Sequence, residues 1–404
     1  MGASDILHQH LIDPEICIRC NTCEATCPIG AITHDDRNYV VDPDKCNLCM
    51  ACVPPCPTGS IDNWRDVPRA HAYSLQDQLG WDELPEPSTE APAGHTDGDH
   101  TPPPAPSGPG SVQAPWSAAT PHTQLFGPGA DKATVRAKVS GNLRVTDVGS
   151  DYDTHHIVLD FGEAHFPVLE GQSIGIVPPG TDANGRAHFP RQYSVASPRN
   201  GERPGYNNLS LTVKRVLQDH SGQPVRGVAS NYVCDLQVGD EVDVVGPYGQ
   251  SFLMPNHPGS HVVMICTGTG SAPMRAITEY RRRLRAQGQD VGGKLLLFFG
   301  ARTQRELPYF GPLQKLPADF IESHFAFSRE ANQPKRYVQD LMREQAATLA
   351  PLLGHADAFF YVCGLKSMEQ GVIDALRDIA TDDGMDWAQL SAQLAQGRLH
   401  LETN

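Results

Sequence analysis

Residues 17–61 read CIRCNTCEATCPIGAITHDDRNYVVDPDKCNLCMACVPPCPTGSI and contain eight of the eleven cysteines of this 404-residue chain. The cysteines form two runs of the same pattern, C-x2-C-x2-C-x3-C-P, which close on Pro28 and Pro57. Each cysteine of the first run recurs 29 positions later, as Gly30 does at Gly59. The segment is therefore an internal duplication. Its cysteines are Cys17, Cys20, Cys23, Cys27, Cys46, Cys49, Cys52 and Cys56.

This spacing predicts iron–sulfur ligation. Thiolates are soft ligands that suit iron–sulfur clusters, and in the bacterial ferredoxin run the fourth cysteine ligates the other cluster. We expect two [4Fe-4S] clusters, one on Cys17, Cys20, Cys23 and Cys56, the other on Cys46, Cys49, Cys52 and Cys27. Structural zinc is the alternative, but zinc does not need a third closely spaced cysteine and a following proline twice. A disulfide framework is less favoured still, because each middle cysteine has close neighbours on both sides.

Composition excludes several classes of function. The net charge of −15 argues against a nucleic-acid or anionic-membrane partner, since phosphate binding needs a basic face. No apolar run reaches eighteen residues, so the sequence predicts no transmembrane helix. The N-terminus lacks the basic start and apolar core of a signal peptide, and we expect a cytoplasmic protein.

Four segments follow from the patterning, and they predict a multidomain protein. Residues 1–81 form a small α+β ferredoxin-like domain, in which the apolar run Tyr39–Val41 after the turn at 35–38 predicts a hairpin strand. Residues 82–130, rich in proline and glycine, form a solvated linker. Residues 131–256 contain alternating segments separated by glycine turns, which indicates a Greek-key antiparallel β-barrel. Residues 257–404 alternate apolar strands such as HVVMIC and AFFYVCG with helical stretches such as Met274 to Gln287 and Arg336 to Ala347, which indicates a doubly wound parallel α/β domain.

The last segment carries a glycine-rich turn, Thr267–Pro273, between a predicted strand and helix. Backbone N–H groups at such a junction favour a pyrophosphate, although a tight structural turn would look the same. The next strand ends at 300–302 without an acidic residue to accept from a ribose 2'-hydroxyl. One strand later come a hydroxyl, two cations and a ring, which suit a 2'-phosphate and an adenine and favour NADP over NAD: Ser328, Arg329, Lys335 and Tyr337.

From about residue 132 to its end the chain resembles plant-type ferredoxin–NADP reductases. The motifs EGQSIGIVPPG, RQYSVAS, LTVKR, GVASNYVCDLQVGDEV, CTGTGSAPMR, FSRE and YVCGL occur in the family's order. The resemblance implies an FAD-binding barrel followed by an NADP-binding domain. It implies that FAD lies against Arg191, Gln192, Tyr193, Ser194, Val213, Lys214, Gly227, Val228, Ala229 and Ser230.

In the second domain the resemblance implies that NADPH binds Thr267, Gly268, Thr269, Gly270, Ser328, Arg329, Lys335, Tyr337, Cys363 and Gly364. It implies a catalytic set of Ser194, Cys363 and Glu402 around the nicotinamide and flavin. Taken without the family, Cys363 is a buried small hydrophobic residue, and Glu402 a solvated carboxylate in a frayed tail.

Two positions depart from the family pattern. The family ends in an aromatic residue stacked on the flavin, whereas this chain ends in Asn404. The family also has a tyrosine near the FAD adenine where this chain has Gln218. We therefore expect the flavin face to be covered differently and the adenine to be held differently.

Together these features predict an NADPH-dependent oxidoreductase that passes electrons from NADPH through FAD and two [4Fe-4S] clusters to a protein acceptor. Fusions of this kind resemble the reductase component of benzoyl-CoA epoxidase, which implies a di-iron oxygenase as partner and a role in aromatic catabolism. Two alternatives stay open. One is a ferredoxin–NADP reductase of general electron metabolism, and the other is a flavin reductase with a zinc-bound docking module.

Overall fold

The computed structural model describes residues 6–53, 56, 58–85, 124–130, 132–219, 221–254, 259–289, 292–309 and 316–403. Residues 86–123 of the predicted linker, Pro57 and Asn404 lie outside this part of the chain. Contacts divide the chain into two compact units. Unit 1 comprises Met1–Gly108, Glu202–Tyr206 and Tyr309–Leu316, and unit 2 comprises Pro109–Gly201, Asn207–Pro308 and Pro317–Asn404.

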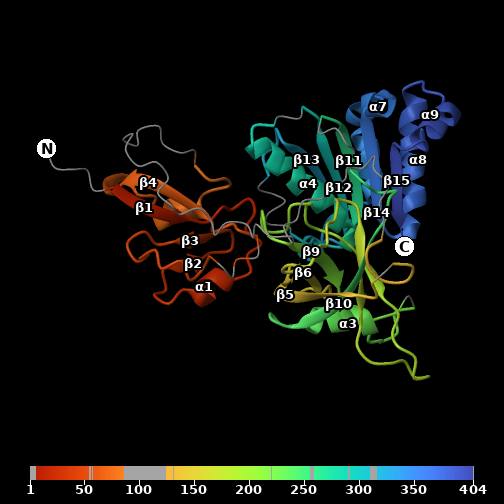
Figure 1. Ribbon diagram of the computed structural model, residues 1–404. Helices are drawn as coiled ribbons and strands as arrows, with labels where there is room; N and C mark the ends of the chain where they lie inside the picture. The colour runs from red at the N-terminus through yellow and green to blue at the C-terminus, as the bar shows by residue number, and fades with distance from the viewer. Residues whose placement is uncertain are drawn as a thin grey trace. The chain divides into compact units, whose positions relative to one another are not determined.

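Unit 1 contains two antiparallel strand pairs, β1 with β4 and β2 with β3 (Figure 1). The turn between β2 and β3 forms because the Asp35 carboxylate accepts from the amides of Arg37 and Asn38. This confirms the hairpin that the sequence predicts there. The elements are β1 (Ile6–Leu11), α1 (Thr22–Thr26), β2 (Ile32–His34), β3 (Tyr39–Val41), β4 (Asn63–Pro68), η1 (Arg69–His71) and α2 (Leu75–Leu79).

The core of unit 1 is small and rich in sulfur. Cysteines of both runs share a buried cluster with Ile12, Ile32, Tyr39 and Ile61. A core of this size supports little stability by itself, so bound metal clusters are expected to contribute to folding.

Unit 2 begins with a six-stranded antiparallel sheet in the order β8-β7-β10-β5-β6-β9. The isolated bridge between Val195, just after β8, and Leu211 on β9 joins its two edges into a barrel. The predicted Greek-key barrel is confirmed. Its elements are β5 (Val135–Arg144), β6 (Thr154–Asp160), β7 (Ser173–Val177), β8 (Arg191–Ser194), β9 (Asn208–Lys214), α3 (Val228–Asp235) and β10 (Glu241–Tyr248).

The described ends of the predicted linker are packed, which corrects its boundaries. Phe126 is 7% exposed in the barrel core, and its backbone bonds to Gly246 in both directions. At the other end, Asp82 pairs with Arg37 and the Pro85 carbonyl accepts from Arg65. Because these short flanks contain apolar and charged side chains with partners, they belong to the folded units rather than to a solvated connection.

The second half of unit 2 is a five-stranded parallel sheet in the order β13-β12-β11-β14-β15. Figure 1 shows α4 and α8 on opposite faces of this sheet, which confirms the doubly wound α/β fold. Its elements are β11 (His261–Thr267), η2 (Gly268–Gly270), α4 (Ser271–Ala286), β12 (Leu295–Ala301), η3 (Gln304–Glu306), β13 (Ile321–Phe327), α6 (Val338–Glu344), α7 (Ala346–Gly354), β14 (Ala358–Gly364), α8 (Lys366–Asp382), α9 (Trp387–Leu394) and β15 (Leu399–Thr403).

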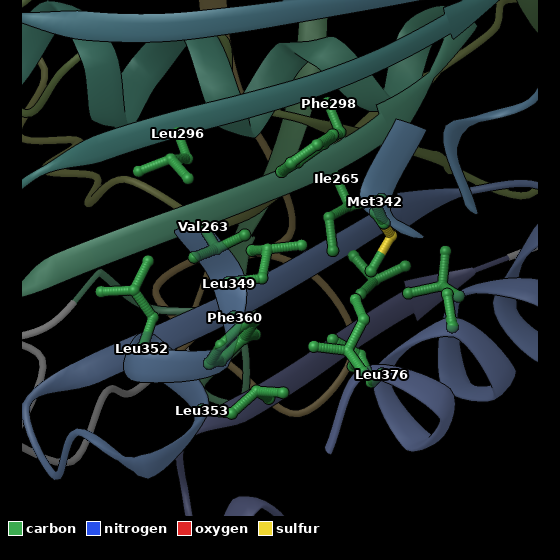
Figure 2. Close-up of a cluster of buried hydrophobic side chains, with 14 of the residues drawn as sticks. Val263, Ile265, Leu296, Phe298, Met342, Leu349, Leu352, Leu353, Phe360 and Leu376 are labelled. Carbon is green, nitrogen blue, oxygen red and sulfur yellow. The ribbon is translucent and has the colours of Figure 1, made fainter. Parts of the chain in front are cut away.

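Alternate residues of the central strands build the largest buried cluster (Figure 2). Val263 and Ile265 of β11 and Phe360 of β14 face Leu353 and Leu376 on the helices that cover one side of the sheet. The intervening residues of these strands are buried on the other face, where Thr278 of α4 contacts Met264. Burial on both faces explains why the strands are continuous apolar runs in the sequence.

One helix differs from the sequence pattern. The helix expected from Arg336 to Ala347 begins at Val338 and ends at Glu344, and a second helix starts at Ala346. Asp340 accepts from the Tyr337 amide and fixes the start of α6. Among the described residues, no helix is long and apolar enough to cross a membrane.

Candidate functional site

A cavity of about 740 Å³ lies within unit 2, where residues of the barrel and of the parallel sheet line one space. Its walls come from the ends of β8 and β9 of the antiparallel barrel and from the carboxyl ends of β11, β12, β13 and β14, which meet at one edge of the parallel sheet. The predicted residues that it brings together are Gln192, Tyr193, Ser194, Lys214, Thr267, Gly268, Thr269, Gly270, Ser328, Arg329, Lys335, Tyr337, Cys363 and Gly364.

Two of the three residues predicted as catalytic, Ser194 and Cys363, line this cavity, and the third, Glu402, lies beside both but is not part of the lining. The Ser194 hydroxyl donates to Glu402 Oε1 at 3.4 Å, across 208 positions of sequence. Glu402 lies opposite Cys363 in the β14–β15 register, and the other Glu402 oxygen, Oε2, is buried without a hydrogen-bond partner among the described residues. Glu402 is thus part of a sheet strand, and its interpretation as a solvated residue of a frayed tail is wrong.

Burial governs proton affinity in this group. It raises the pKa of Glu402, and the hydrogen bond from Ser194 opposes that shift. Burial also raises the pKa of the Cys363 thiol, and the nearby Glu402 charge raises it further. Both side chains therefore favour their protonated forms over a wider pH range than exposed groups do.

The glycine-rich loop joins β11 to α4 and lies against the end of β14. A Cβ added at Gly270 would come within 2.2 Å of the Cys363 carbonyl oxygen, so only glycine allows this approach. The hydroxyls of Thr267 and Ser271 are buried without partners among the described residues. Together with the positive end of the α4 helix dipole, these hydroxyls suit a pyrophosphate.

The opposite wall is cationic. Arg329 and Ser328 follow β13, and their amides donate to the carbonyls of Arg302 and Ala301 at the end of β12. Lys335 lies 5.0 Å from the Tyr337 ring, which is partly exposed. A 2'-phosphate and an adenine fit this group of cations and ring, as the sequence predicts.

Some predicted flavin residues do not line the cavity. Arg191 is exposed at the start of β8, while Val213 is buried in the barrel core. Gly227 to Ser230 form the start of α3, where Ser230 Oγ accepts from the Val216 amide and a Cβ on Gly227 would meet that oxygen at 2.9 Å. Within this group Val228 is exposed, whereas Ser230 is buried.

The flavin side of the cavity also contains an unsatisfied group. The Tyr193 ring packs against the barrel core, and its phenolic oxygen is buried without a hydrogen-bond partner in the described part of the chain. Burial raises the pKa of Tyr193, so it is a neutral hydrogen-bond donor here. The Tyr193 hydroxyl is thus a donor without an acceptor, and a flavin bound beside the ring would supply one. Gln218, by contrast, is exposed in a hairpin that the Gln218–Pro224 bridge closes.

Among the residues of the cavity wall that sequence reasoning missed are Tyr152, Arg302 and Glu306. Tyr152 precedes β6, and its ring lies 3.5 Å from Lys214 Nζ and 4.6 Å from the Arg302 guanidinium carbon. Glu306 lies in η3, four residues past the strand end that contains no acid. No sequence motif marks these three positions. The one signal that could have been used is that Arg302 lies at the end of a predicted strand.

In unit 1 the cysteines group across the two runs. Burial raises the pKa of Cys23, and charges on Cys17, Cys20 and Cys56 raise it further. Burial likewise raises the pKa of Cys52 to about 12, with Cys46, Cys27 and Cys49 adding to the shift. Each set thus combines three cysteines of one run with the fourth of the other, which is the exchange that the spacing predicts.

The duplication extends to the backbone. Arg19 and Asn21 have φ of 59° and 60°, and Leu48 and Met50, 29 positions later, have 56° and 60°. Left-handed conformations at non-glycine residues cost free energy, on the order of 1–2 kcal/mol each. Alternation of left- and right-handed residues makes N–H groups converge on an anion, so the strain suits a ligand such as a cluster.

No group of three or more His, Cys, Asp or Glu residues in the described part of the chain is arranged around a single ion. A zinc site needs its donors around one point, whereas a cubane cluster holds four thiolates at separate corners. The donor chemistry and the grouping of the cysteines therefore fit clusters better than zinc.

The barrel, the parallel sheet and their shared cavity define an oxidoreductase that uses NADP and FAD. Residues 264–374 match the oxidoreductase NAD-binding domain, and residues 16–60 match the 4Fe-4S dicluster domain.

The chain is 38% identical over 273 residues to the cyanelle ferredoxin–NADP reductase of Cyanophora paradoxa, covering 65% of this chain and 74% of that protein. It is 36% identical over 277 residues to the ferredoxin–NADP reductase of Spirulina sp, covering 66% and 94%. The structure resembles the ferredoxin–NADP+ reductase of Plasmodium falciparum with 2'P-AMP, with TM-score 0.55, 22% identity, and 67% and 96% coverage. The chain belongs to the ferredoxin–NADP reductase family and has, in addition, an N-terminal 4Fe-4S dicluster domain.

Proposed function

We propose that the protein is a reductase component that takes electrons from NADPH and delivers them through FAD and two [4Fe-4S] clusters to a separate protein. The observation that carries this proposal is the cavity that places Tyr193 and Ser194 of the barrel beside the Thr267–Gly270 loop and Cys363 of the sheet. When bound, FAD accepts a hydride from NADPH and gives electrons up singly, which a cluster requires.

The residues of the cavity position the reactants. Thr267 and the amides at the start of α4 hold the pyrophosphate, while Arg329 and Lys335 hold the 2'-phosphate. Ser194 and Glu402 keep a proton beside the site of transfer, because burial raises the pKa of Glu402. The Cys363 thiol excludes water from the same corner, since it is only 6% exposed.

The proposed cluster ligands are Cys17, Cys20, Cys23 and Cys56 for one centre and Cys46, Cys49, Cys52 and Cys27 for the other. The cross-run grouping of the cysteines supports this assignment. Hydrogen bonds to the ligands would tune the cluster potentials: the Ala31 amide donates to Cys27 Sγ at 3.2 Å, and the Ser60 hydroxyl lies 3.5 Å from Cys56 Sγ.

The proposed acceptor is a di-iron oxygenase component, the benzoyl-CoA 2,3-epoxidase of aerobic benzoate degradation in the cytoplasm. Support comes from the fusion of a dicluster domain to a reductase, which supplies a one-electron outlet within the chain.

A second candidate is a ferredoxin–NADP reductase of general electron metabolism, which the names of the relatives favour. The two functions differ in acceptor and direction. Rates of NADPH oxidation with the purified oxygenase component, set against rates of NADP+ reduction with reduced ferredoxin, separate them.

The test of the electron route is Cys20→Ser. We expect NADPH-dependent dye reduction to persist and reduction of the protein acceptor to fall by at least about 100-fold, because one cluster loses a ligand. Lys45→Gln, an exposed change between the two cysteine runs, serves as the control. Equal losses of both activities in Cys20→Ser would refute the route, and stoichiometric zinc without acid-labile sulfide would refute the cofactor.

A further inference from the structure

One wall of the cavity combines four side chains from four separate segments: Tyr152, Lys214, Arg302 and Glu306. The Tyr152 ring lies within 3.5 Å of Lys214 Nζ and 4.6 Å of the Arg302 guanidinium carbon. Two cations thus share one aromatic ring, which attracts both through its electron-rich faces.

The two cations are held close despite their repulsion. Burial lowers the pKa of Lys214, and the neighbouring Arg302 charge lowers it further, while Glu306 opposes the shift. A site that keeps two partly desolvated cations together is suited to an anion of at least equal charge.

Glu306 is the sole carboxylate among the described residues that line the cavity, against five cations: Lys214, Arg302, Arg329, Lys335 and Arg336. Its Oε2 atom is buried and has no hydrogen-bond donor in the described part of the chain. Burial raises the pKa of Glu306, although the charges of Arg302, Lys214 and Arg329 pull it down. The carboxylate therefore balances these cations electrostatically without being locked by a donor to Oε2.

We infer that Glu306 is an internal counter-anion of a phosphate subsite that Lys214 and Arg302 form on the Tyr152 ring. A phosphate of the dinucleotide competes there with the Glu306 charge for the same two cations. This inference rests on the proposed function, since it assigns residues to the binding of NADPH. The diphosphate and the 2'-phosphate offer the same chemistry to this subsite.

The subsite couples binding to protonation. A phosphate that enters raises the pKa of Glu306 further by like-charge repulsion, so Glu306 takes up a proton on binding and returns to the charged form on release. The groups that face it are Arg302, Lys214, Arg329 and Asp151. Burial raises the pKa of the Tyr152 phenol, so Tyr152 stays neutral. Burial also raises the pKa of Glu306, so its carboxylate takes up a proton as the pH falls.

The test is Glu306→Gln, measured as the dissociation constant of NADP+ by titration of flavin absorbance in the full-length protein. At pH 8 and low salt we expect NADP+ to bind about tenfold more tightly than to the wild type, which is about 1.4 kcal/mol. As the pH falls, the difference between the two proteins should shrink, because burial raises the pKa of Glu306 and the wild-type carboxylate takes up a proton. Taking the ratio of the two proteins cancels the titration of the ligand phosphate.

Glu163→Gln removes the same charge from an exposed turn and controls for net charge. 2'-AMP carries only the 2'-phosphate, and ADP-ribose carries only the diphosphate. The ligand that Glu306→Gln binds more tightly than the wild type identifies which phosphate the subsite receives. The inference is overturned if Glu306→Gln weakens NADP+ binding, which would mean that Glu306 accepts a hydrogen bond from a ribose hydroxyl. It is also overturned if the ratio of the two dissociation constants does not change with pH, or if Glu163→Gln has the same effect as Glu306→Gln. Failure of the proposed function is distinct: wild type and both variants would then all fail to bind NADP+.

Discussion

The approach of the glycine-rich loop to β14 provides a sharp test of how the cavity is built. Gly270 has φ of −61°, so alanine meets no backbone strain there. Its Cβ, however, would lie 2.2 Å from the Cys363 carbonyl oxygen and 2.6 Å from its carbon, closer than the 3.0 Å limit that real Cβ atoms respect. The clash is with backbone, so the loop and the strand end must separate by about 3.0 − 2.2 = 0.8 Å.

The magnitude follows from this displacement. Overpacking of a well-packed site costs about 1–3 kcal/mol, and a domain of this size loses roughly 2–4 °C of Tm for each kcal/mol. We expect Gly270→Ala to lower the Tm of unit 2 by about 2–12 °C. Because the loop holds the nucleotide, a shift approaching 1 Å should also lower kcat/KM for NADPH by up to about 100-fold.

The assay combines thermal unfolding of the flavin-loaded protein with NADPH-dependent dye reduction. Gly288→Ala is the matched control: its φ is +69° and its Cβ meets nothing within 4 Å, so it carries strain without a clash. That variant should lose about 1–2 kcal/mol of stability and keep its NADPH kinetics. Wild-type kinetics in Gly270→Ala, or the same kinetic loss in Gly288→Ala, would refute the steric argument.

Three further predictions concern charge and packing. Arg329→Ala should raise KM for NADPH at least about tenfold while KM for NADH changes little, because only NADPH carries the 2'-phosphate; equal changes in steady-state assays would remove that assignment. Burial raises the folded-state pKa of Glu402 above its ordinary 4.5. Between the unfolded-state pKa and the folded-state pKa, the folded protein keeps a proton that the unfolded chain releases, so the free energy of unfolding falls as the pH rises through this range. In urea unfolding, the free energy of unfolding of Glu402→Gln minus that of the wild type should therefore be larger at pH 8 than at pH 4.5. The same difference at both pH values would contradict the raised pKa. Phe360→Ala removes a ring that is 0% exposed in the sheet core and should cost about 3–5 kcal/mol in urea unfolding; a loss under 1 kcal/mol would mean that the core collapses around the gap.

Much of the site could be predicted from local spacing. Each cysteine run predicts four ligands, and the fourth cysteine of each run is predicted to ligate the cluster that the other run holds. This prediction is local because a cluster accepts only a narrow range of ligand separations along a chain. The left-handed residues Arg19 and Leu48 occur at equivalent places for the same reason. Likewise, a glycine-rich turn between strand and helix is a local unit, and the Thr267–Gly270 loop occupies the place that its sequence indicates.

Other features are not encoded locally. The linker ends were assigned to solvent by composition, yet Phe126 fills the barrel core because Gly246 offers it backbone partners 120 positions away. The single helix expected from Arg336 to Ala347 divides into two, although its periodicity is continuous. In both places tertiary contacts override the local pattern.

The amino-acid sequence by itself determined that a 4Fe-4S dicluster segment precedes a nucleotide-binding reductase, and it predicts the sulfur ligands, since the cysteine runs and the glycine-rich turn are each confined to a few tens of positions. Only the tertiary structure decided that Ser194 donates to Glu402, 208 positions away, and that Tyr152, Arg302 and Glu306 share a wall with Lys214. The reason is physical: the charge balance of a cavity depends on distances in space between segments, and those distances exist only once the barrel and the sheet have folded.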